Sequence, residues 1–194
     1  MEATERKLAL EHLNASRERL LATVRGLSAE QRMFQAAERR WSVADCLEHL
    51  IIVENFVWKT MQNVLQTPPQ PEKQAEVRPR DQIVLEMVPA RTRRVAGPPG
   101  VHPTRSWRDF GELVQQFEIA RARTLQFAAS SDADLRCHFF PHPIIGDLDC
   151  YQWLLFLGTH CERHVRQMEE VMADPGFPAR HSASSGQQSA AGQL

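Results

Sequence analysis

Apolar residues recur at intervals of three and four along four long stretches of the chain, and this spacing is the period of an α-helix with one buried face. The first stretch covers 2–26, and the second begins at Ser42 and ends before the paired prolines at 68–69. The third covers 106–129 and the fourth covers about 149–173. The residues predicted to line the buried faces are Leu13, Leu20 and Leu27; Cys46, His49, Leu50, Val53, Phe56, Val57, Met61 and Val64; Trp107, Phe110, Val114, Phe117, Ala120 and Phe127; and Trp153, Leu157, His160, His164, Met168 and Val171.

Polar residues at the starts of these stretches have the pattern of helix caps. A hydroxyl or carboxylate at such a position accepts a hydrogen bond from a backbone N–H that the helix itself leaves unpaired. Ser42 followed by Asp45 fits this pattern, and Ser106 followed by Asp109 predicts the start of the third helix. Gly26 is a predicted stop, and Ser28 predicts a fresh helical turn after it.

The segment 66–105 differs from the helical stretches because it holds most of the prolines. Within it, only 81–88 has the pattern of a short helix. A connection of this length suits a crossover on a helical bundle, where it can shield the mouth of a cavity. Strand signals are nearly absent, and 135–148 is expected to form an extended connection.

These patterns predict an all-α fold, a four-helix bundle with a long crossover between its second and third helices. Residues 1–175 are expected to form this one domain. Residues 176–194 are rich in serine, alanine, glutamine and glycine, which predicts a flexible polar tail.

Composition and charge argue against several classes of protein. The 194-residue chain has a net charge of −1, which argues against binding to nucleic acid or to an anionic membrane. No apolar run approaches the roughly 20 residues that span a bilayer, and the first residues lack the apolar stretch of a secretory signal. The cysteines are widely spaced without a CxxC motif, which indicates free thiols in a reducing cytoplasm. They are Cys46, Cys137, Cys150 and Cys161.

His160 and His164 carry the strongest chemical signal in the sequence. They lie one helical turn apart on the predicted buried face of the fourth helix, so both imidazoles can reach one metal ion. A buried polar group without a partner costs about 1–3 kcal/mol, and a shared ion would satisfy both rings. His49, on the buried face of the second helix, is the best candidate for a third ligand. Three imidazoles with an open position form the ligand set of a catalytic divalent site.

Two questions remain open from spacing alone. The three histidines can also be hydrogen-bonded core residues of a metal-free bundle, since an inward histidine by itself is more often of that kind. With an ion present, imidazoles accept zinc, nickel, iron or manganese, so the spacing does not select the metal.

Other polar residues near the motifs are weaker candidates for ligands. Cys161 is next to a candidate ligand but points about 100° away from it on a helix. Glu48 and Glu54 lie off the stripe that faces the proposed ion. One of them, or Gln167, is expected to hydrogen-bond the far nitrogen of a liganding histidine and fix its tautomer.

The remaining histidines and a group of arginines have simpler interpretations. We expect His142 and His138 to belong to a loop turn and His12 to lie at the surface. Lining of the site mouth is the alternative for His142. We expect solvated side chains for the arginines of the crossover, with anion binding as the alternative. These arginines are Arg91, Arg93 and Arg94.

Three short segments of the chain resemble the DinB-like / YfiT-like superfamily of metal-dependent four-helix bundles. They are WSVADCLEHL at 41–50, HPIIGDL at 142–148 and HCERHVRQ at 160–167. The family pattern has a tryptophan–serine helix start leading to a histidine, then a His-Pro turn with a glycine, then two histidines four apart followed by a glutamine. The resemblance covers most of 1–175. It implies that the metal ligands are His49, His160 and His164.

The resemblance also implies a kind of activity. Such proteins act as hydrolases or use a low-molecular-weight thiol in S-transfer or isomerisation. The expected cofactors are therefore a divalent metal ion, zinc or nickel first, and a small thiol. We expect a metal-dependent enzyme that acts on a small molecule and pairs into a homodimer. No general base is evident near the motifs, which favours thiol transfer slightly over hydrolysis. The alternative is a non-enzymatic bundle that only binds a metal or a ligand.

Overall fold

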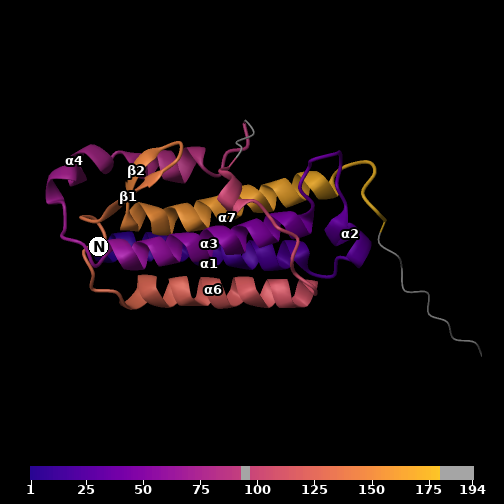
Figure 1. Ribbon diagram of the computed structural model, residues 1–194, viewed down its shortest axis with the longest axis horizontal. Coiled ribbons are helices and arrows are strands. Elements are labelled where there is room, and N and C mark those ends of the chain that lie inside the picture. The colour runs from indigo at the N-terminus through magenta and orange to yellow at the C-terminus, as the bar shows by residue number, and fades with distance from the viewer. Residues whose placement is uncertain (93–96, 180–194) are drawn as a thin grey trace, which may run out of the picture.

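Four long helices lie side by side along the length of the molecule (Figure 1). The computed structural model describes residues 1–92 and 97–179. The long helices are α1 (Ala3–Val24), α3 (Val43–Val64), α6 (Phe110–Ser130) and α7 (Cys150–Met172). α1 packs most extensively against α7, and α3 packs against both α6 and α7. The predicted four-helix bundle is confirmed. No helix in the described ranges is long and apolar enough to cross a membrane.

Short elements connect the long helices. α2 (Ala29–Met33) follows α1, and a β-hairpin precedes α7, with β1 (Phe139–His142) antiparallel to β2 (Gly146–Asp149). The crossover from α3 to α6 lies along the same side of the bundle as this hairpin (Figure 1). It contains η1 (Pro71–Lys73), α4 (Gln74–Val77), α5 (Arg80–Gln82), η2 (Ile83–Met87) and η3 (Pro99–Val101).

The predicted caps of the second helix and of the short turn after Gly26 are confirmed. The Ser42 side chain accepts a hydrogen bond from the Asp45 N–H, and the Asp45 carboxylate accepts one from the Ser42 N–H in return. Ser28 caps α2 in the same reciprocal way. Gly26 ends α1 with a φ of 71°, a left-handed conformation that glycine adopts without steric cost.

The predicted start of the third helix is wrong by one turn. Asp109 rather than Ser106 caps α6, because the Asp109 carboxylate accepts the bond from the Glu112 N–H at 3.0 Å. Ser106 instead exchanges a hydrogen bond with the Thr104 hydroxyl. Trp107 therefore lies ahead of the helix rather than on its buried stripe.

More regular secondary structure lies between the long helices than the sequence patterns predicted. Short helical turns cover 71–87 of the crossover, beyond the one turn expected near 81–88. The connection before α7 is extended as expected, but it pairs with itself as a hairpin, with Phe139 opposite Asp149. Each of these elements is too short for an apolar spacing to repeat within it, so periodicity does not reveal it, and the prolines and glycines suggest irregular structure instead.

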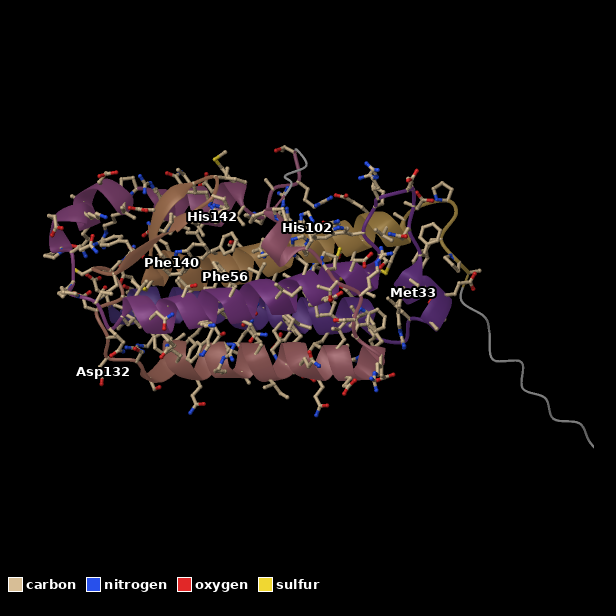
Figure 2. The ribbon with its side chains drawn as sticks, in the orientation of Figure 1. Met33, Phe56, His102, Asp132, Phe140 and His142 are labelled. Atoms are coloured by element: carbon tan, nitrogen blue, oxygen red, sulfur yellow. The ribbon has the colours of Figure 1, made fainter. Side chains whose placement is uncertain are left out.

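One predicted buried residue lies at the surface. Phe56 of α3 is 52% exposed, although Val53 and Val57 on either side of it are buried (Figure 2). Phe56 is three residues after Val53 and directly before Val57, so it lies at the edge of the apolar face, where spacing alone does not decide between burial and exposure.

The helices α1 and α7 approach each other closely at Gly158. A Cβ atom added there would lie 2.9 Å from the Cβ of His12 and 3.0 Å from its backbone carbonyl carbon. Glycine is therefore required for the backbones of α1 and α7 to touch. His12, expected at the surface, is half-buried at this contact.

A buried ion pair joins the four long helices at the centre of the bundle. The Arg121 guanidinium on α6 is 0% exposed and binds the Glu54 carboxylate of α3 with donor–acceptor distances of 2.9–3.1 Å. Its other donors reach the Leu13 carbonyl and the Ser16 hydroxyl on α1, and the Leu157 carbonyl on α7. All three guanidinium nitrogens are thus hydrogen-bonded, which offsets the cost of burying the charge.

Replacing Arg121 with methionine should destabilise the bundle by about 3–5 kcal/mol, because the Glu54 carboxylate would be left buried without its counter-charge. Urea unfolding followed by circular dichroism measures this change. The exposed Lys7–Glu11 pair on α1 provides the control, and Lys7→Met should cost less than about 0.5 kcal/mol. Equal effects of the two substitutions would contradict this role for Arg121.

Candidate metal centre

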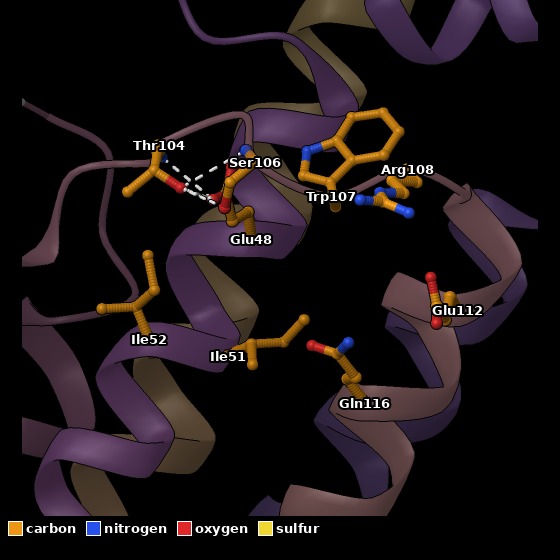
Figure 3. Close-up of a pocket in the computed structure, with 9 residues that line it drawn as sticks. All are labelled: Glu48, Ile51, Ile52, Thr104, Ser106, Trp107, Arg108, Glu112 and Gln116. Carbon is orange, nitrogen blue, oxygen red and sulfur yellow. Dashed lines mark hydrogen bonds between the residues drawn. The ribbon is translucent and has the colours of Figure 1, made fainter.

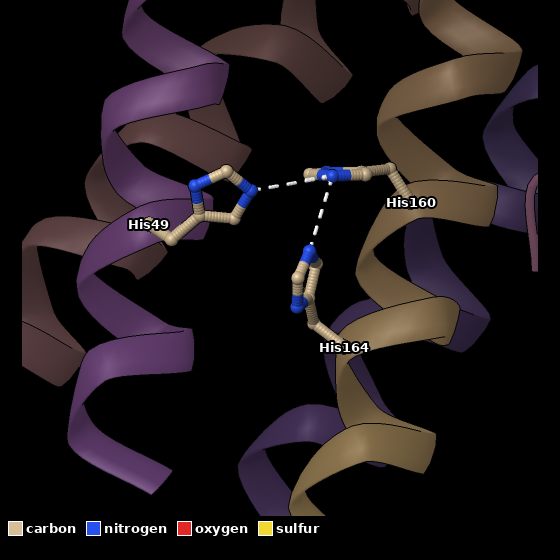
Figure 4. Close-up of side chains that lie close together, drawn as sticks. All are labelled: His49, His160 and His164. Carbon is tan, nitrogen blue, oxygen red and sulfur yellow. Dashed lines mark hydrogen bonds between the residues drawn. The ribbon is translucent and has the colours of Figure 1, made fainter. Parts of the chain in front are cut away.

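Three imidazole rings from two facing helices converge on one point in the bundle. His49 projects from α3, and His160 and His164 project from α7 (Figure 4). The Nε2 atom of His160 lies 3.4 Å from that of His49 and 3.1 Å from that of His164. One nitrogen from each ring lies within 4.8 Å of the others, which is the geometry of three ligands around a single ion.

Aromatic neighbours fix the orientation of these rings. Trp41, directly before the cap of α3, lies 4.8 Å from the His49 ring and stacks on the His164 ring at 5.8 Å between centroids. Phe156 stacks on the His160 ring at 4.8 Å. Each imidazole therefore has little freedom to turn away from the common point.

Burial keeps the three imidazoles neutral. It lowers the pKa of His49 to about 4 and lowers the pKa values of His160 and His164 well below the ordinary value, and repulsion from neighbouring rings of the cluster adds to the effect on His160 and His164. A neutral imidazole offers a free lone pair, which is the form that binds a metal. The donor set thus fits a divalent ion without prior loss of protons at neutral pH.

A backbone carbonyl sets the tautomer of His49. The His49 Nδ1 atom lies 2.6 Å from the carbonyl oxygen of Val101 in the crossover. A carbonyl can only accept, so Nδ1 carries the proton and Nε2 presents its lone pair to the other two rings. The sequence held no signal for this contact, because any residue supplies a backbone carbonyl.

The side chains expected to support the ligands have other partners. Glu48 binds the backbone of Thr104 and Arg105, and Glu54 binds Arg121. Gln167 accepts a hydrogen bond from Arg91. The Gln167 side chain is near enough to His164 to raise the pKa of its ring slightly against the effect of burial. The His164 Nδ1 atom nevertheless has no hydrogen-bond partner among the described residues.

Comparison with known proteins places this architecture in a family. Residues 12–168 match the sequence profile of the DinB superfamily. The chain belongs to the DinB superfamily. The match spans the stretch from α1 to α7 that contains all three histidines.

Two known proteins are similar to this chain, one in sequence and one in fold. The chain is 25% identical over 149 residues to the uncharacterized protein YuaE of Bacillus subtilis (strain 168). The aligned residues make up 76% of this chain and 87% of YuaE. It also superimposes on TT2238, a four-helix bundle protein, with a TM-score of 0.54 and 23% identity over 85% of this chain and 98% of that one. The second likeness concerns the fold alone.

The cysteines of this DinB chain lie outside the histidine cluster. Cys161 points its Sγ atom toward the Ser16 carbonyl of α1 at 3.6 Å, as its position on the helix predicted. In the described ranges all four cysteines are buried and free, and burial raises the pKa of Cys161 to about 11. Of the histidine, cysteine and acidic side chains described, the three histidines form the one group with the spacing of a metal site.

His142 and His138 have structural roles in this DinB bundle. The His142 Nδ1 atom accepts hydrogen bonds from the backbone N–H groups of Ile144 and Ile145, which closes the hairpin turn as expected. The His138 ring is buried rather than in an open loop, and its nitrogens bond the carbonyls of Asp134 and Thr67.

His102 is a histidine near the site that sequence reasoning missed. Its ring lies 6.1 Å from that of Trp41, and its charged form disfavours protonation of His49. Its Nε2 atom bonds the Gly97 carbonyl at 2.9 Å. It lies in the proline-rich crossover, where no helical period marks it (Figure 2).

The arginines of the crossover are only partly described. Arg91 is held by the Glu170 carboxylate through Nε and Nη2, at 2.6 and 2.8 Å, so it is ion-paired rather than freely solvated. Arg93 and Arg94 lie outside the described residues. The tail beyond Ala179 also lies outside them, whereas Phe177 packs against Phe34 of the loop after α2.

The pH dependence of stability offers a test of the His142 environment. Burial lowers the pKa of His142 to about 4, whereas an unfolded histidine titrates near pH 6.5. As the pH falls from about 6.5 to about 4, the unfolded chain therefore binds a proton that the folded chain does not, and stability is lost. The metal-free wild type should lose more stability in this range than a His142→Asn variant.

Urea unfolding at about pH 7.5 and about pH 4.5 measures this difference, and asparagine retains an oxygen that can accept the two turn hydrogen bonds. An equal loss of stability in both proteins would show that His142 is not kept neutral by the fold.

Proposed function

We propose that this DinB-superfamily protein binds one divalent metal ion through His49, His160 and His164 and acts as a metal-dependent enzyme on a small molecule. The observation that carries the proposal is the convergence of three neutral imidazoles, with Nε2 atoms 3.1 and 3.4 Å apart along the cluster. Without an ion, a proton on one Nε2 atom must bridge the rings at these distances, whereas a bound ion would take the lone pairs of all three. Zinc and nickel are among the ions that accept imidazole ligands.

The residues around the cluster hold the three rings in the orientation that a bound ion would need. A tri-histidine ion supplies a Lewis acid that lowers the pKa of a water or thiol bound to it. Trp41 and Phe156 hold the rings in place and exclude water from their faces. His49 keeps its Nδ1 proton on the Val101 carbonyl, so its Nε2 lone pair stays directed at the ion's position.

The acidic side chains next to the cluster already have hydrogen-bond partners, which favours thiol-dependent S-transfer over hydrolysis. Hydrolysis needs a proton acceptor near the ion, and the nearby buried carboxylates of Glu48 and Glu54 are both committed to other partners. A thiol held as thiolate needs no such acceptor in its attack on an electrophile.

Hydrolysis is the second candidate, and His102 is the observation that favours it. Its Nε2 atom donates to the Gly97 carbonyl, which leaves the Nδ1 lone pair as a proton acceptor close to the Trp41 side of the cluster. Its role in hydrolysis would be that of a general base.

His160→Ala and His164→Ala should each abolish metal binding and leave the bundle folded, since most stability comes from the apolar faces of the helices. Untagged protein freed of metal is titrated with Co²⁺ and Ni²⁺, and bound metal is measured after gel filtration. Quenching of Trp41 fluorescence provides a second readout, because its indole lies on two of the rings. His12→Gln, which alters a histidine outside the cluster, is the control and should bind as the wild type does.

Two results would count against this proposal. Wild-type protein that retains no metal after reconstitution would leave a metal-free bundle with three core histidines. Global unfolding of either alanine variant, with a normal His12→Gln control, would assign the ion a structural role instead of an enzymatic one.

The reaction class is tested by two parallel assays of the metal-loaded protein. We expect turnover of small electrophiles in the presence of cellular low-molecular-weight thiols, and loss of that turnover in His164→Ala. Ester and amide substrates without thiol test hydrolysis, for which His102→Gln should reduce the rate about 100-fold. Thiol-independent hydrolysis that His102→Gln abolishes would replace S-transfer with the second candidate. Inactivity in both assays would favour a protein that only binds a ligand.

A further inference from the structure

The crossover is tied to α3 directly beside the histidine cluster. We call residues 101–106 the strap. The Glu48 carboxylate accepts hydrogen bonds from the Thr104 N–H at 2.9 Å and from the Thr104 hydroxyl at 2.7 Å (Figure 3). It also accepts one from the Arg105 N–H at 2.9 Å. Glu48 is 7% exposed, so water competes little for these bonds.

A second carboxylate one turn earlier holds the same strap. The Arg105 guanidinium binds Asp45 through Nε and Nη2, both at 2.8 Å. Arg105 has a φ of 58°, in the left-handed region that is sterically unfavourable for a residue with a side chain. The bonds to Asp45 and Glu48 offset this cost, and they therefore select the conformation of the strap.

Packing alone does not hold the strap. A cavity of about 510 Å³ lies beside it, lined in part by Glu48 and Thr104 of the tie, by Trp107, and by Glu112 on α6 (Figure 3). Val101 and His102 at the start of the strap pack against the core and against Trp41, whereas Thr104 and Ser106 border this open space. The position of Thr104 and Arg105 therefore depends on the polar bonds to Glu48 and Asp45.

The same strap carries the carbonyl that orients His49. Val101 lies three residues before Thr104, with the rigid Pro103 between them. Its carbonyl oxygen is 2.6 Å from His49 Nδ1. Glu48 and His49 are adjacent on α3. One helical turn therefore carries both the histidine and the carboxylate that binds the strap containing the histidine's hydrogen-bond partner.

We propose that Glu48 is a positioning residue for the metal centre. It holds the strap so that the Val101 carbonyl keeps His49 in the Nδ1–H tautomer, with the Nε2 lone pair facing His160 and His164. The proposal deepens the function proposed above, and its tautomer readout needs no metal.

The first test measures the His49 tautomer in metal-free protein by ¹⁵N NMR of the imidazole rings. Wild-type protein should show a single Nδ1–H form for His49. Glu48→Gln places an amide N–H₂ where one carboxylate oxygen accepted hydrogen bonds, so it should give a mixture of tautomers. The same substitution should weaken Co²⁺ binding about tenfold, as loss of outer hydrogen bonds to metal ligands does. It should also shift the Co²⁺ absorption bands.

Two further variants separate positioning from general damage to the fold. Glu112→Gln changes a carboxylate that lines the same cavity but has no bond to the strap in the described residues, and it should leave Co²⁺ affinity and tautomer unchanged. Thr104→Val removes the hydroxyl bonds to Glu48 and to Ser106 but keeps the two backbone N–H bonds to Glu48, so it should shift both readouts in the same direction as Glu48→Gln but less. If Glu48→Gln does not fold, Thr104→Val decides the question alone.

A wild-type tautomer and Co²⁺ affinity in both folded variants would overturn the role of Glu48. So would an equal effect of Glu112→Gln. If the wild type binds no metal but Glu48→Gln still changes the His49 tautomer, the positioning role stands and the proposed function fails.

Discussion

The fully buried guanidinium of Arg121 can be satisfied in only one mutual arrangement of the four long helices. It takes the Glu54 carboxylate from α3, a carbonyl and a hydroxyl from α1, and the Leu157 carbonyl from α7. A slip of any helix by one residue would leave a buried donor or acceptor unpaired, at a cost of about 1–3 kcal/mol for each group. His49 and Glu54 share α3, and His160 follows Leu157 on α7, so the same bonds fix the heights at which the three imidazoles meet.

The sequence predicted the elements that have a repeating apolar pattern, and it missed the single contacts that have no pattern. The period of three and four predicted the long helices, and reciprocal caps such as Ser42 with Asp45 predicted where they begin. The start of α6 was wrong because Ser106 and Asp109 both have cap chemistry, and only the competing bond between Ser106 and Thr104 decides between them. The convergence of His49 with the pair on α7 was visible from their shared buried faces. The Val101 carbonyl was not visible, because a backbone group in a loop leaves no mark in the sequence.

The centre and the crossover form one unit, although they are far apart in the sequence. His49 has its hydrogen-bond partner in the segment that the sequence marks only by its prolines. Membership of the DinB superfamily explains the bundle and the order of the histidine motifs. The crossover contributes the Val101 carbonyl to His49 and places His102 beside Trp41 at the edge of the cluster.

The glycine contact between α1 and α7 divides the centre into a fixed and an adjustable half. Because backbone touches backbone at Gly158, α7 cannot slide or roll toward α1, and His160 and His164 stay where that contact sets them. His49 has no backbone contact of this kind: the bonds of Arg121 to Glu54 set its height, and hydrogen bonds through the crossover set the orientation of its ring. An ion of larger or smaller radius at the proposed site would therefore be accommodated by movement of the His49 ring together with Val101. Tolerance of the site for ions of different size would depend on the crossover, while the angle between the other two ligands would depend on α7.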